Sequence, residues 1–296
     1  MRLPDQHLAA FEAQRPRLLR LGYRMLGSVS EAEDVVQEAW LRWARVEDSI
    51  DAPAAYLTRI VTRLCLDQLK SARARRETYV GAWLPDPLMG TTDDEVLAHD
   101  LTLTLMLAME RLSPLERAAF LLRDVFDTPL DEVAATLGRA PAAVRQLAAR
   151  ARRHLQDARP RYAIQSEEAE RIARAFFTAA SSGDATALSG LLASEVAIHS
   201  DGGGKVLAFL NVIRGLDRAV RLFQGLARKP AYQPRFLRAV TIDGLPGYVS
   251  IDRGQVLQTT ALDIREGKVV AVYIVRNPDK LRHVAAVLEQ GQPSGA

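Results

Sequence analysis

Arginines recur along one stretch of the chain in a pattern that suits nucleic-acid recognition. Seven arginines and a single acidic residue lie between residues 139 and 161. A guanidinium group can donate two parallel hydrogen bonds to guanine or to a phosphate, so arginine serves both base reading and backbone binding. The chemistry that this pattern predicts is contact with a DNA major groove. The residues expected to face outward there are Arg145, Gln146, Ala149, Arg150, Arg152 and Arg153.

A helix-turn-helix pattern would hold these arginines outward. Apolar residues recur at helical spacing over residues 130–137 and again over residues 141–155, so each segment is predicted to be a helix with one buried face. Gly138 supplies the turn between them, and Pro141 can begin the second helix. The alternative is an arginine-rich helix that is merely solvated in a bundle. The predicted buried residues are Leu130, Val133, Ala134, Leu137, Val144, Leu147, Ala148, Ala151 and Leu155.

Three segments carry the signature of a helix start. Ser113–Glu116 has the spacing of a capping box, and Ser30–Glu33 has the same spacing nearer the front of the chain. Thr128–Asp131 is a similar arrangement that ends in aspartate. Such a pair lets a side chain accept from a backbone N–H that the first helical turn leaves unpaired. We therefore expect helices to begin near each of these segments.

Residues 8–77 are predicted to be mostly helical, with an acidic helix followed by a basic one. Asp34, Glu38 and Leu41 recur at i, i+4 and i+7 with Gln37 beside them, which makes an acidic face with an apolar centre. Such a face suits a basic partner helix, and the alternative is a solvated acidic surface. The expected core residues are Val35, Val36, Ala39, Trp40 and Trp43 in the first helix, and Tyr56, Ile60, Leu64 and Leu69 in the second.

The rest of the chain differs in character from these helices. Residues 79–105 contain prolines and an acidic end, which predicts a linker. After residue 166, two helices are followed by strand-like runs over 196–199, 236–242, 248–251, 256–264 and 269–275, with helices near 216–228 and 278–290. This order predicts an α+β domain with a mostly antiparallel sheet. The fold class is therefore multidomain, with two all-α modules in front of an α+β domain.

On these motifs the chain resembles the extracytoplasmic-function sigma factors, in the subgroup with a fused SnoaL-like domain. The segments that show the resemblance are EAEDVVQEAWLRW, AYLTRIVTRLCLDQLKSARARRE, LSPLERAAFLLRDVF and the helix-turn-helix, with the strings WLPDP, DGGGK and NPDKL. Asp86 stands where the subgroup pattern has Glu. The resemblance implies region 2 over residues 5–78, a linker over 79–105, region 4 over 106–160 and a SnoaL-like, nuclear transport factor 2-like cone over 166–291.

The resemblance also assigns roles. Asp34, Gln37, Glu38 and Leu41 would bind the clamp coiled coil of the largest polymerase subunit. The helix at 141–155 would read the minus-35 promoter element, and the basic helix over residues 59–76 would approach the minus-10 element. Many members carry asparagine near Arg63, so a minus-10 base preference is not carried over. The minus-10 candidates are Arg59, Arg63, Lys70, Arg73, Arg75 and Arg76.

The three strings imply regulation in cis, with the back domain acting on the sigma modules. DGGGK is a flexible turn between an acid and a base, and NPDKL is expected to start the last helix. Without the family pattern, these would be an ordinary hairpin loop and an ordinary helix start. The candidate regulatory residues are Trp83, Leu84, Pro85, Asp86, Pro87, Asp201, Gly202, Gly203, Gly204, Lys205, Asn277, Pro278, Asp279, Lys280 and Leu281.

Other functions remain as alternatives at this point. The chain could be a helix-turn-helix regulator whose back domain senses a small ligand or catalyses a reaction. His199 with Asp201 is the best acid–base pair for catalysis, but the two share a strand face only if the strand continues through Asp201, which the three glycines that follow make doubtful. The candidate carboxylates beyond that pair are Asp243, Asp252 and Asp263. We expect no enzyme activity, no cofactor and no metal site.

The composition narrows the partners and the compartment. No run of 18 uncharged apolar residues occurs, and the first residues lack a secretory apolar core, so we expect a cytoplasmic protein that is a monomer when free. The single cysteine, Cys65, excludes an internal disulfide and is expected to be a small core residue. The expected partners are core RNA polymerase and promoter DNA, with a small ligand in the cone left open.

Overall fold

The computed structural model describes residues 5–46, 50–89, 102–156, 166–229, 234–252 and 255–290. The chain forms two compact units. One comprises Met1–Glu77 with Leu105–Arg159, and the other comprises Thr78–Thr104 with Pro160–Ala296. The linker thus belongs to the same unit as the C-terminal domain. No helix in the described part of the chain is long and apolar enough to cross a membrane.

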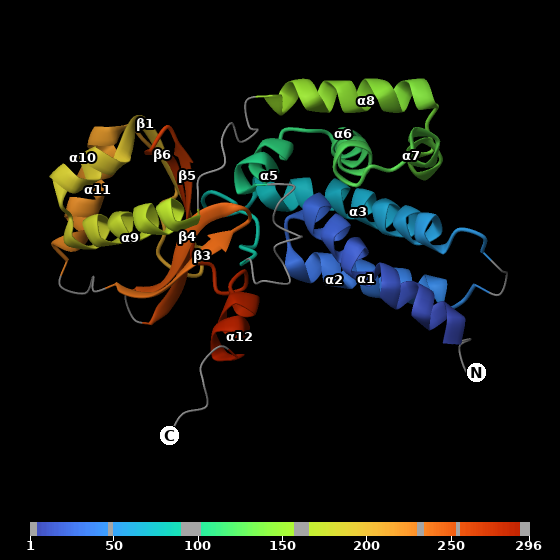
Figure 1. Ribbon diagram of the computed structural model, residues 1–296, viewed down its shortest axis with the longest axis horizontal. Helices are drawn as coiled ribbons and strands as arrows, with labels where there is room; N and C mark the ends of the chain where they lie inside the picture. Colours follow the sequence, from blue (N-terminus) through green and yellow to red (C-terminus); the bar gives the residue numbers. More distant parts are fainter. Residues whose placement is uncertain are drawn as a thin grey trace. The chain divides into compact units, whose positions relative to one another are not determined.

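The first unit is entirely helical and begins with three helices that pack on one another (Figure 1). They are α1 (Asp5–Leu26), α2 (Val29–Trp43) and α3 (Pro53–Glu77). The predicted core of α2 is confirmed except at Trp40, which is half-buried. Helix α2 begins two residues earlier than the Ser30 pattern suggests, because Ser28 is its N-cap and accepts a hydrogen bond from the Glu31 amide.

The buried face of α3 differs from the predicted one. Tyr56, Ile60 and Leu64 are only half-buried, and the fully buried positions lie one residue further along. The reason is that α3 packs against α1 and also against α6 and α7, so its buried face is wider and turned relative to a single apolar stripe. Cys65 belongs to this core, and burial raises the pKa of its thiol. The fully buried apolar residues of α3 are Leu57, Val61, Cys65 and Leu69.

The second half of the helical unit contains the predicted helix-turn-helix. Its elements are α5 (Leu103–Met109), of which the first two residues fall in the other unit, then α6 (Pro114–Phe120), the π-helical turn η1 (Leu121–Val125), α7 (Leu130–Leu137) and α8 (Pro141–His154). Gly138 adopts the left-handed conformation at the end of α7, with φ of 62°, as the turn requires. The predicted burial is confirmed except at Leu130, which is half-buried.

The predicted caps of this half have different outcomes. Ser113 and Glu116 form the complete capping box ahead of α6. Thr128 does not cap α7, because the N-cap position is Pro129 and no side chain bonds the first turn. The buried guanidinium of Arg117 ties this half to α1 by donating to the Met25 carbonyl at 2.8 Å and to the Met109 carbonyl at 2.7 Å. Desolvation lowers the pKa of Arg117 to about 10.

The second unit is an α+β cone with one six-stranded sheet of order β2-β1-β6-β5-β4-β3. Only the β1–β6 pair is parallel among the described pairings, so the predicted mostly antiparallel sheet is confirmed. The two-residue β2 was missed by the sequence reading. The strands are β1 (Leu192–Asp201), β2 (Ile213–Arg214), β3 (Arg235–Ile242), β4 (Leu245–Asp252), β5 (Val256–Arg265) and β6 (Lys268–Val275).

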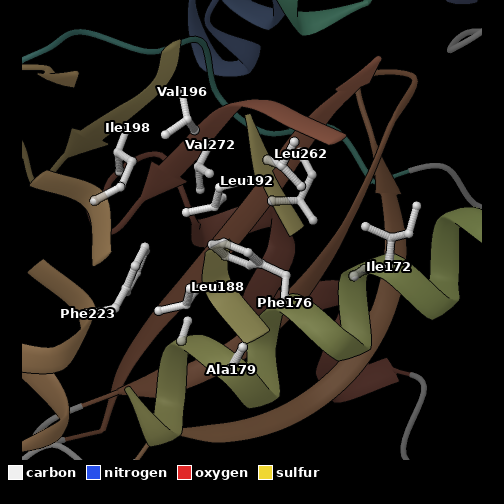
Figure 2. Packing of buried hydrophobic residues seen from close by; sticks show 14 of the residues in the cluster. Ile172, Phe176, Ala179, Leu188, Leu192, Val196, Ile198, Phe223, Leu262 and Val272 are labelled. Atoms are coloured by element: carbon white, nitrogen blue, oxygen red, sulfur yellow. The ribbon is translucent and has the colours of Figure 1, made fainter. Parts of the chain in front are cut away.

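The core of the cone lies between the sheet and three helices. Those helices are α9 (Ser166–Ser182), α10 (Ala185–Leu191) and α11 (Leu216–Ala227), while α12 (Arg282–Gln290) follows the last strand. Figure 2 shows Phe176 of α9 and Phe223 of α11 directed at aliphatic side chains of the sheet. The two rings meet edge-on with centroids 5.5 Å apart. The cluster includes residues of β1 and β6, which are neighbouring strands of the sheet.

Candidate functional site

The acidic face of α2 is open to solvent as predicted. Asp34 and Gln37 are exposed, and Leu41 retains 45% of its surface. Glu38 is half-buried and forms an ion pair with Arg42, with 2.8 Å between Oε1 and Nε. Exposed i,i+4 pairs of this kind are weak, so the pair leaves Glu38 available to another cation. The helix therefore presents two carboxylates around an exposed leucine.

The outward face of α8 also matches the prediction. Arg145, Gln146, Ala149 and Arg153 are exposed, and a small residue at position 149 leaves room for close approach to a surface. Arg150 departs from this pattern because it is only half-exposed. It donates from Nε to Oε1 of Glu116 at 2.8 Å. The arginine face is thus anchored to α6 through one of its own members.

Two of the arginines that were expected to contact DNA form ion pairs with carboxylates of the same chain. Burial alone would raise the pKa of Glu116, but hydrogen bonds from Arg150 and Ser113 outweigh it and lower the pKa to about 2. Arg152 pairs with Asp124 of η1, with 2.7 Å between Nε and Oδ1. Neither carboxylate was predicted from the sequence as a partner of these arginines, although Glu116 carried a signal as the last residue of the capping box.

The basic side of α3 is less continuous than predicted. Arg63 is exposed, while Arg59 is half-buried with its guanidinium 5.6 Å from the centroid of the Tyr56 ring. Lys70 forms an ion pair with Asp67, with 2.7 Å between Nζ and Oδ1. The side chains of Arg73, Arg75 and Arg76 lie outside the described residues.

The linker binds to the cone through a buried carboxylate at the end of β1. The strand continues through Asp201, contrary to the doubt raised by the following glycines, and the side chain of Asp201 is fully buried. Oδ1 accepts from the Tyr79 hydroxyl at 2.6 Å and from the Gly203 amide at 3.0 Å. Oδ2 accepts from the Leu84 amide at 2.9 Å. Two linker residues, Tyr79 and Leu84, thus donate hydrogen bonds to the same carboxylate.

Lys280 supplies the positive charge that this carboxylate needs. Its ammonium lies 2.8 Å from Oδ2 of Asp201 and also donates to the Leu84 carbonyl. The same ammonium sits 4.4 Å from the centroid of the Trp83 ring and 5.0 Å from that of Tyr79. Cation–π contacts of this kind strengthen when the cation is desolvated, and Lys280 is only 8% exposed. Trp83 therefore packs on the cation of the NPDKL string.

The strings DGGGK and NPDKL meet at this point. Asn277 donates from Nδ2 to the Tyr79 hydroxyl at 2.9 Å. Gly203 has φ of 60°, and a Cβ there would lie 2.2 Å from Nδ2 of Asn277, so only glycine fits. Lys205 and Asp279 form an exposed ion pair between the two strings. NPDKL is a turn rather than the helix start that was predicted, because α12 begins at Arg282.

The other residues of the WLPDP, DGGGK and NPDKL strings differ in how far they are buried. Leu84, Pro85, Asp86 and Pro87 are buried, as are Gly202 and Leu281, while Gly204 and Pro278 are exposed. We call the assembly of linker residues 79–89 with Asp201, Asn277 and Lys280 the linker dock. Its polar hub is completed by Tyr79, which lies outside the predicted set. Burial and the hydrogen bond to Asp201 raise the pKa of Tyr79 above its ordinary value.

A second attachment lies at the β3–β4 turn. Asp243 accepts at Oδ2 from the Leu88 amide at 3.1 Å, and its own amide donates to the Leu88 carbonyl at 2.9 Å. Its carbonyl accepts from the Leu103 amide at 2.9 Å, so it holds linker residues on both sides of 90–101. His283 of α12 contacts the Pro87 carbonyl at 2.6 Å. The sequence offered Asp243 only as a candidate catalytic carboxylate, and no motif pointed to His283.

The candidate catalytic residues have structural partners instead. His199 is largely buried, and its pKa falls to about 4 through desolvation and the nearby charge of Arg214. Its ring lies beside that of Tyr273, while Asp201 on the same strand serves the linker dock. Asp252 pairs with Arg276 and Asp263 with Arg265. No cluster of potential metal ligands occurs within the described residues.

Comparison with known proteins gives these features a family context. Residues 10–75 match the Sigma-70 region 2 model, and residues 102–155 match the model of Sigma-70 region 4. The ECF RNA polymerase sigma factor SigJ of Mycobacterium tuberculosis is 38% identical, with 97% of each chain covered. The probable ECF sigma factor SigI of the same organism is 33% identical, covering 97% of this chain and 99% of its own.

A solved structure agrees with these relatives. The crystal structure of M. tuberculosis SigJ aligns with a TM-score of 0.73 and 33% identity, covering 93% of this chain and 98% of the other. Region 2 followed by region 4 and an α+β domain is the organisation of an alternative sigma factor, and the SigJ structure shares it over 93% of this chain. The chain belongs to the extracytoplasmic-function family of RNA polymerase sigma factors. These relatives are transcription factors rather than enzymes, and the simple helix-turn-helix regulator is not favoured.

Replacing Asp201 by asparagine should release the linker. Asp201→Asn keeps the shape but leaves the buried ammonium of Lys280 without its counter-charge, which should lower the free energy of unfolding of the α+β unit by about 3–5 kcal/mol. Urea denaturation measures this loss, and hydrogen exchange of residues 79–89 should become faster. The matched control is Asp279→Asn, whose exposed ion pair should contribute less than about 1 kcal/mol. Equal stability of the two variants would rule out the linker dock as a restraint.

Proposed function

We propose that this sigma factor binds the clamp coiled coil of core RNA polymerase through α2, reads minus-35 and minus-10 promoter elements through α8 and α3, and is regulated in cis by the linker dock. The free chain is a monomer that acts in the cytoplasm beside its polymerase. The observation that carries the regulatory part is the burial of Asp201 against linker residues 79 and 84. The proposal for the two DNA-binding helices rests on their exposed basic side chains and the two matched regions.

The acidic face of α2 supports the polymerase contact. Asp34, Gln37 and Leu41 are exposed together with the weakly paired Glu38, so the face offers negative charge around an apolar centre. A basic helix would pair with the carboxylates and cover the leucine. Association driven in this way is sensitive to charge reversal and to salt.

The double variant Asp34→Lys/Glu38→Lys should therefore lose holoenzyme assembly. We expect pull-down of purified core polymerase to fall at least tenfold, and promoter-specific transcription in vitro to fall with it. Glu12→Lys/Glu132→Lys changes the same number of charges on exposed residues of other helices and should retain assembly. Normal pull-down by the α2 variant would exclude this face from the polymerase contact.

The outward face of α8 supports minus-35 recognition. The proposed contacts are Arg145, Gln146, Ala149, Arg150, Arg152 and Arg153, of which Arg150 and Arg152 leave intramolecular carboxylates to reach DNA. Phosphates and guanine edges both accept from guanidinium groups, so DNA can replace Glu116 and Asp124 as partners. The proposed phosphate contacts near minus-10 are Arg59, Arg63, Lys70, Arg73, Arg75 and Arg76.

Arg150→Ala should weaken promoter binding by about 1–3 kcal/mol if Arg150 pairs with a base. Glu116→Gln distinguishes base pairing by Arg150 from its anchoring of α8 to α6. The change removes the ion-pair partner of Arg150, while glutamine can still form the capping box with Ser113. We expect the arginine variant, but not the glutamine variant, to bind a minus-35 duplex more weakly in fluorescence anisotropy. Similar losses in both would assign Arg150 a structural role, and Arg171→Ala in α9 serves as an unaffected control.

Cis regulation follows from what the linker connects. The linker joins region 2 to region 4 in the chain, and its residues 79–89 are held by the cone. A held linker limits how far the two sigma modules can separate, whereas a released one spans at most about 3.3–3.6 Å per residue. The cone can therefore set the spacing at which the modules meet the two promoter elements.

Transcription in vitro with purified core polymerase tests this regulation. Asp201→Asn should change the yield of promoter-specific transcripts at least threefold, and deletion from Ser166 onward should change it in the same direction. Glu170→Gln, which removes an exposed ion pair within α9, should behave like the parent chain. Equal transcript yields from the parent, the Asp201 variant and the deletion would contradict regulation in cis while leaving the sigma activity itself intact.

A further inference from the structure

The cone contains a cavity that neither the sigma modules nor the linker dock uses. Its volume is about 230 Å³, somewhat smaller than the roughly 300–1,000 Å³ of pockets that hold drug-sized ligands. Aromatic side chains from three elements form much of its wall, including Phe177 of α9, Phe223 of α11 and Tyr248 of β4. Such a wall suits a flat or compact apolar body of one or two rings.

Two serine hydroxyls in the cavity wall have no protein partner. Ser200 of β1 is 2% exposed and Ser250 of β4 is 1% exposed, and the Oγ atom of each makes no hydrogen bond to any described residue. A buried hydroxyl without a partner is costly, and native proteins rarely keep one without a reason. Two such hydroxyls in one cavity indicate a ligand that bears hydrogen-bonding oxygen atoms.

The charges around the cavity favour an anion. Arg276 lies in the wall and pairs with Asp252, with 3.2 Å between Nη2 and Oδ2, and both side chains are almost fully buried. The exposed Lys229 adds a second cation among the lining residues. With two cations and one carboxylate among the described lining residues, the cavity has a net positive charge. A carboxylate suits both the cations and the serine donors.

We propose that this cavity is a binding site for a small aromatic or alicyclic carboxylate. The ring packs against the phenylalanines, and the carboxylate lies on the side of Arg276, where serine hydroxyls of the wall donate to the oxygen atoms of the ligand. The occupied cavity also stabilises the linker dock, a coupling that rests on the proposed regulation in cis.

The coupling has a direct physical route through two strand ends. Ser200 lines the cavity, while its neighbour Asp201 turns to the linker. Arg276 lines the cavity, while Asn277 bonds Tyr79 of the linker. The carbonyl of Asp201 accepts from the amides of both 276 and 277, at 2.7 and 3.0 Å, so the two strand ends move together.

Binding is tested on the full chain with benzoate, cyclohexanecarboxylate and 2-naphthoate, followed by ligand-observed NMR and titration calorimetry. We expect at least one carboxylate to bind at least tenfold more tightly than its neutral counterpart, such as benzyl alcohol for benzoate. Ser200→Ala/Ser250→Ala should weaken that binding at least tenfold. The double change removes only unpartnered hydroxyls, so the fold should persist, and circular dichroism checks this.

Two further variants keep the test decisive. Ser182→Ala, whose exposed hydroxyl bonds a helix carbonyl outside the cavity, should leave the affinity unchanged. Ala180→Leu narrows the cavity from α9 and should exclude 2-naphthoate before benzoate. Failure of all three carboxylates to bind, or equal affinity in the double serine variant, would overturn the site. These readouts contain no polymerase or promoter, so they fail or succeed independently of the proposed function.

The coupling has its own readout. Hydrogen exchange of residues 79–89 should slow when the tightest-binding carboxylate is added, and it should not slow in the double serine variant. Unchanged exchange at saturating ligand would overturn the coupling and leave the binding site in place.

Discussion

The buried carboxylate of Asp201 is the constraint on which the linker arrangement depends. A carboxylate with no exposed surface is destabilising unless charge and hydrogen bonds replace water. Lys280 supplies the charge, and the donors come from Tyr79, Leu84 and the glycine loop. These groups lie on three segments that are far apart in the chain. Because all of them must be present to satisfy one group, the linker and the cone are stable together.

The sheet topology explains why two separate strings meet at this carboxylate. Strands β1 and β6 are neighbours and run parallel, with Asp201 opposite Val275. The carboxyl ends of parallel strands lie at the same edge of a sheet, so the DGGGK loop and the NPDKL turn emerge side by side. The same edge is the rim of the cavity, since Ser200 and Arg276 line it from these strands. One edge therefore holds both the linker and the proposed ligand site.

Charged side chains of the helical unit form ion pairs within the chain as well as exposed surfaces for partners. Arg150 and Arg152 are paired with carboxylates of their own chain, which orders the arginine face before any DNA is present. The two arginine side chains remain 43% and 47% exposed within these pairs, so a phosphate can approach their guanidinium groups. The alternating blocks of acidic and basic residues in the sequence thus serve both internal pairing and the proposed contacts with polymerase and promoter.

Local patterns in the sequence were enough to predict most of the helices and strands. The helix-turn-helix with Gly138, the capping box at Ser113 and the succession of helices and strands of an α+β domain follow from periodicity and turn chemistry, which act over a few residues. Tertiary structure decided which face of α3 is buried, because several helices pack on it, and which residues hold the linker. Tyr79 meets Asp201 across 122 positions of sequence. No local spacing encodes such a pairing, because it exists only once the sheet has brought the strand ends together.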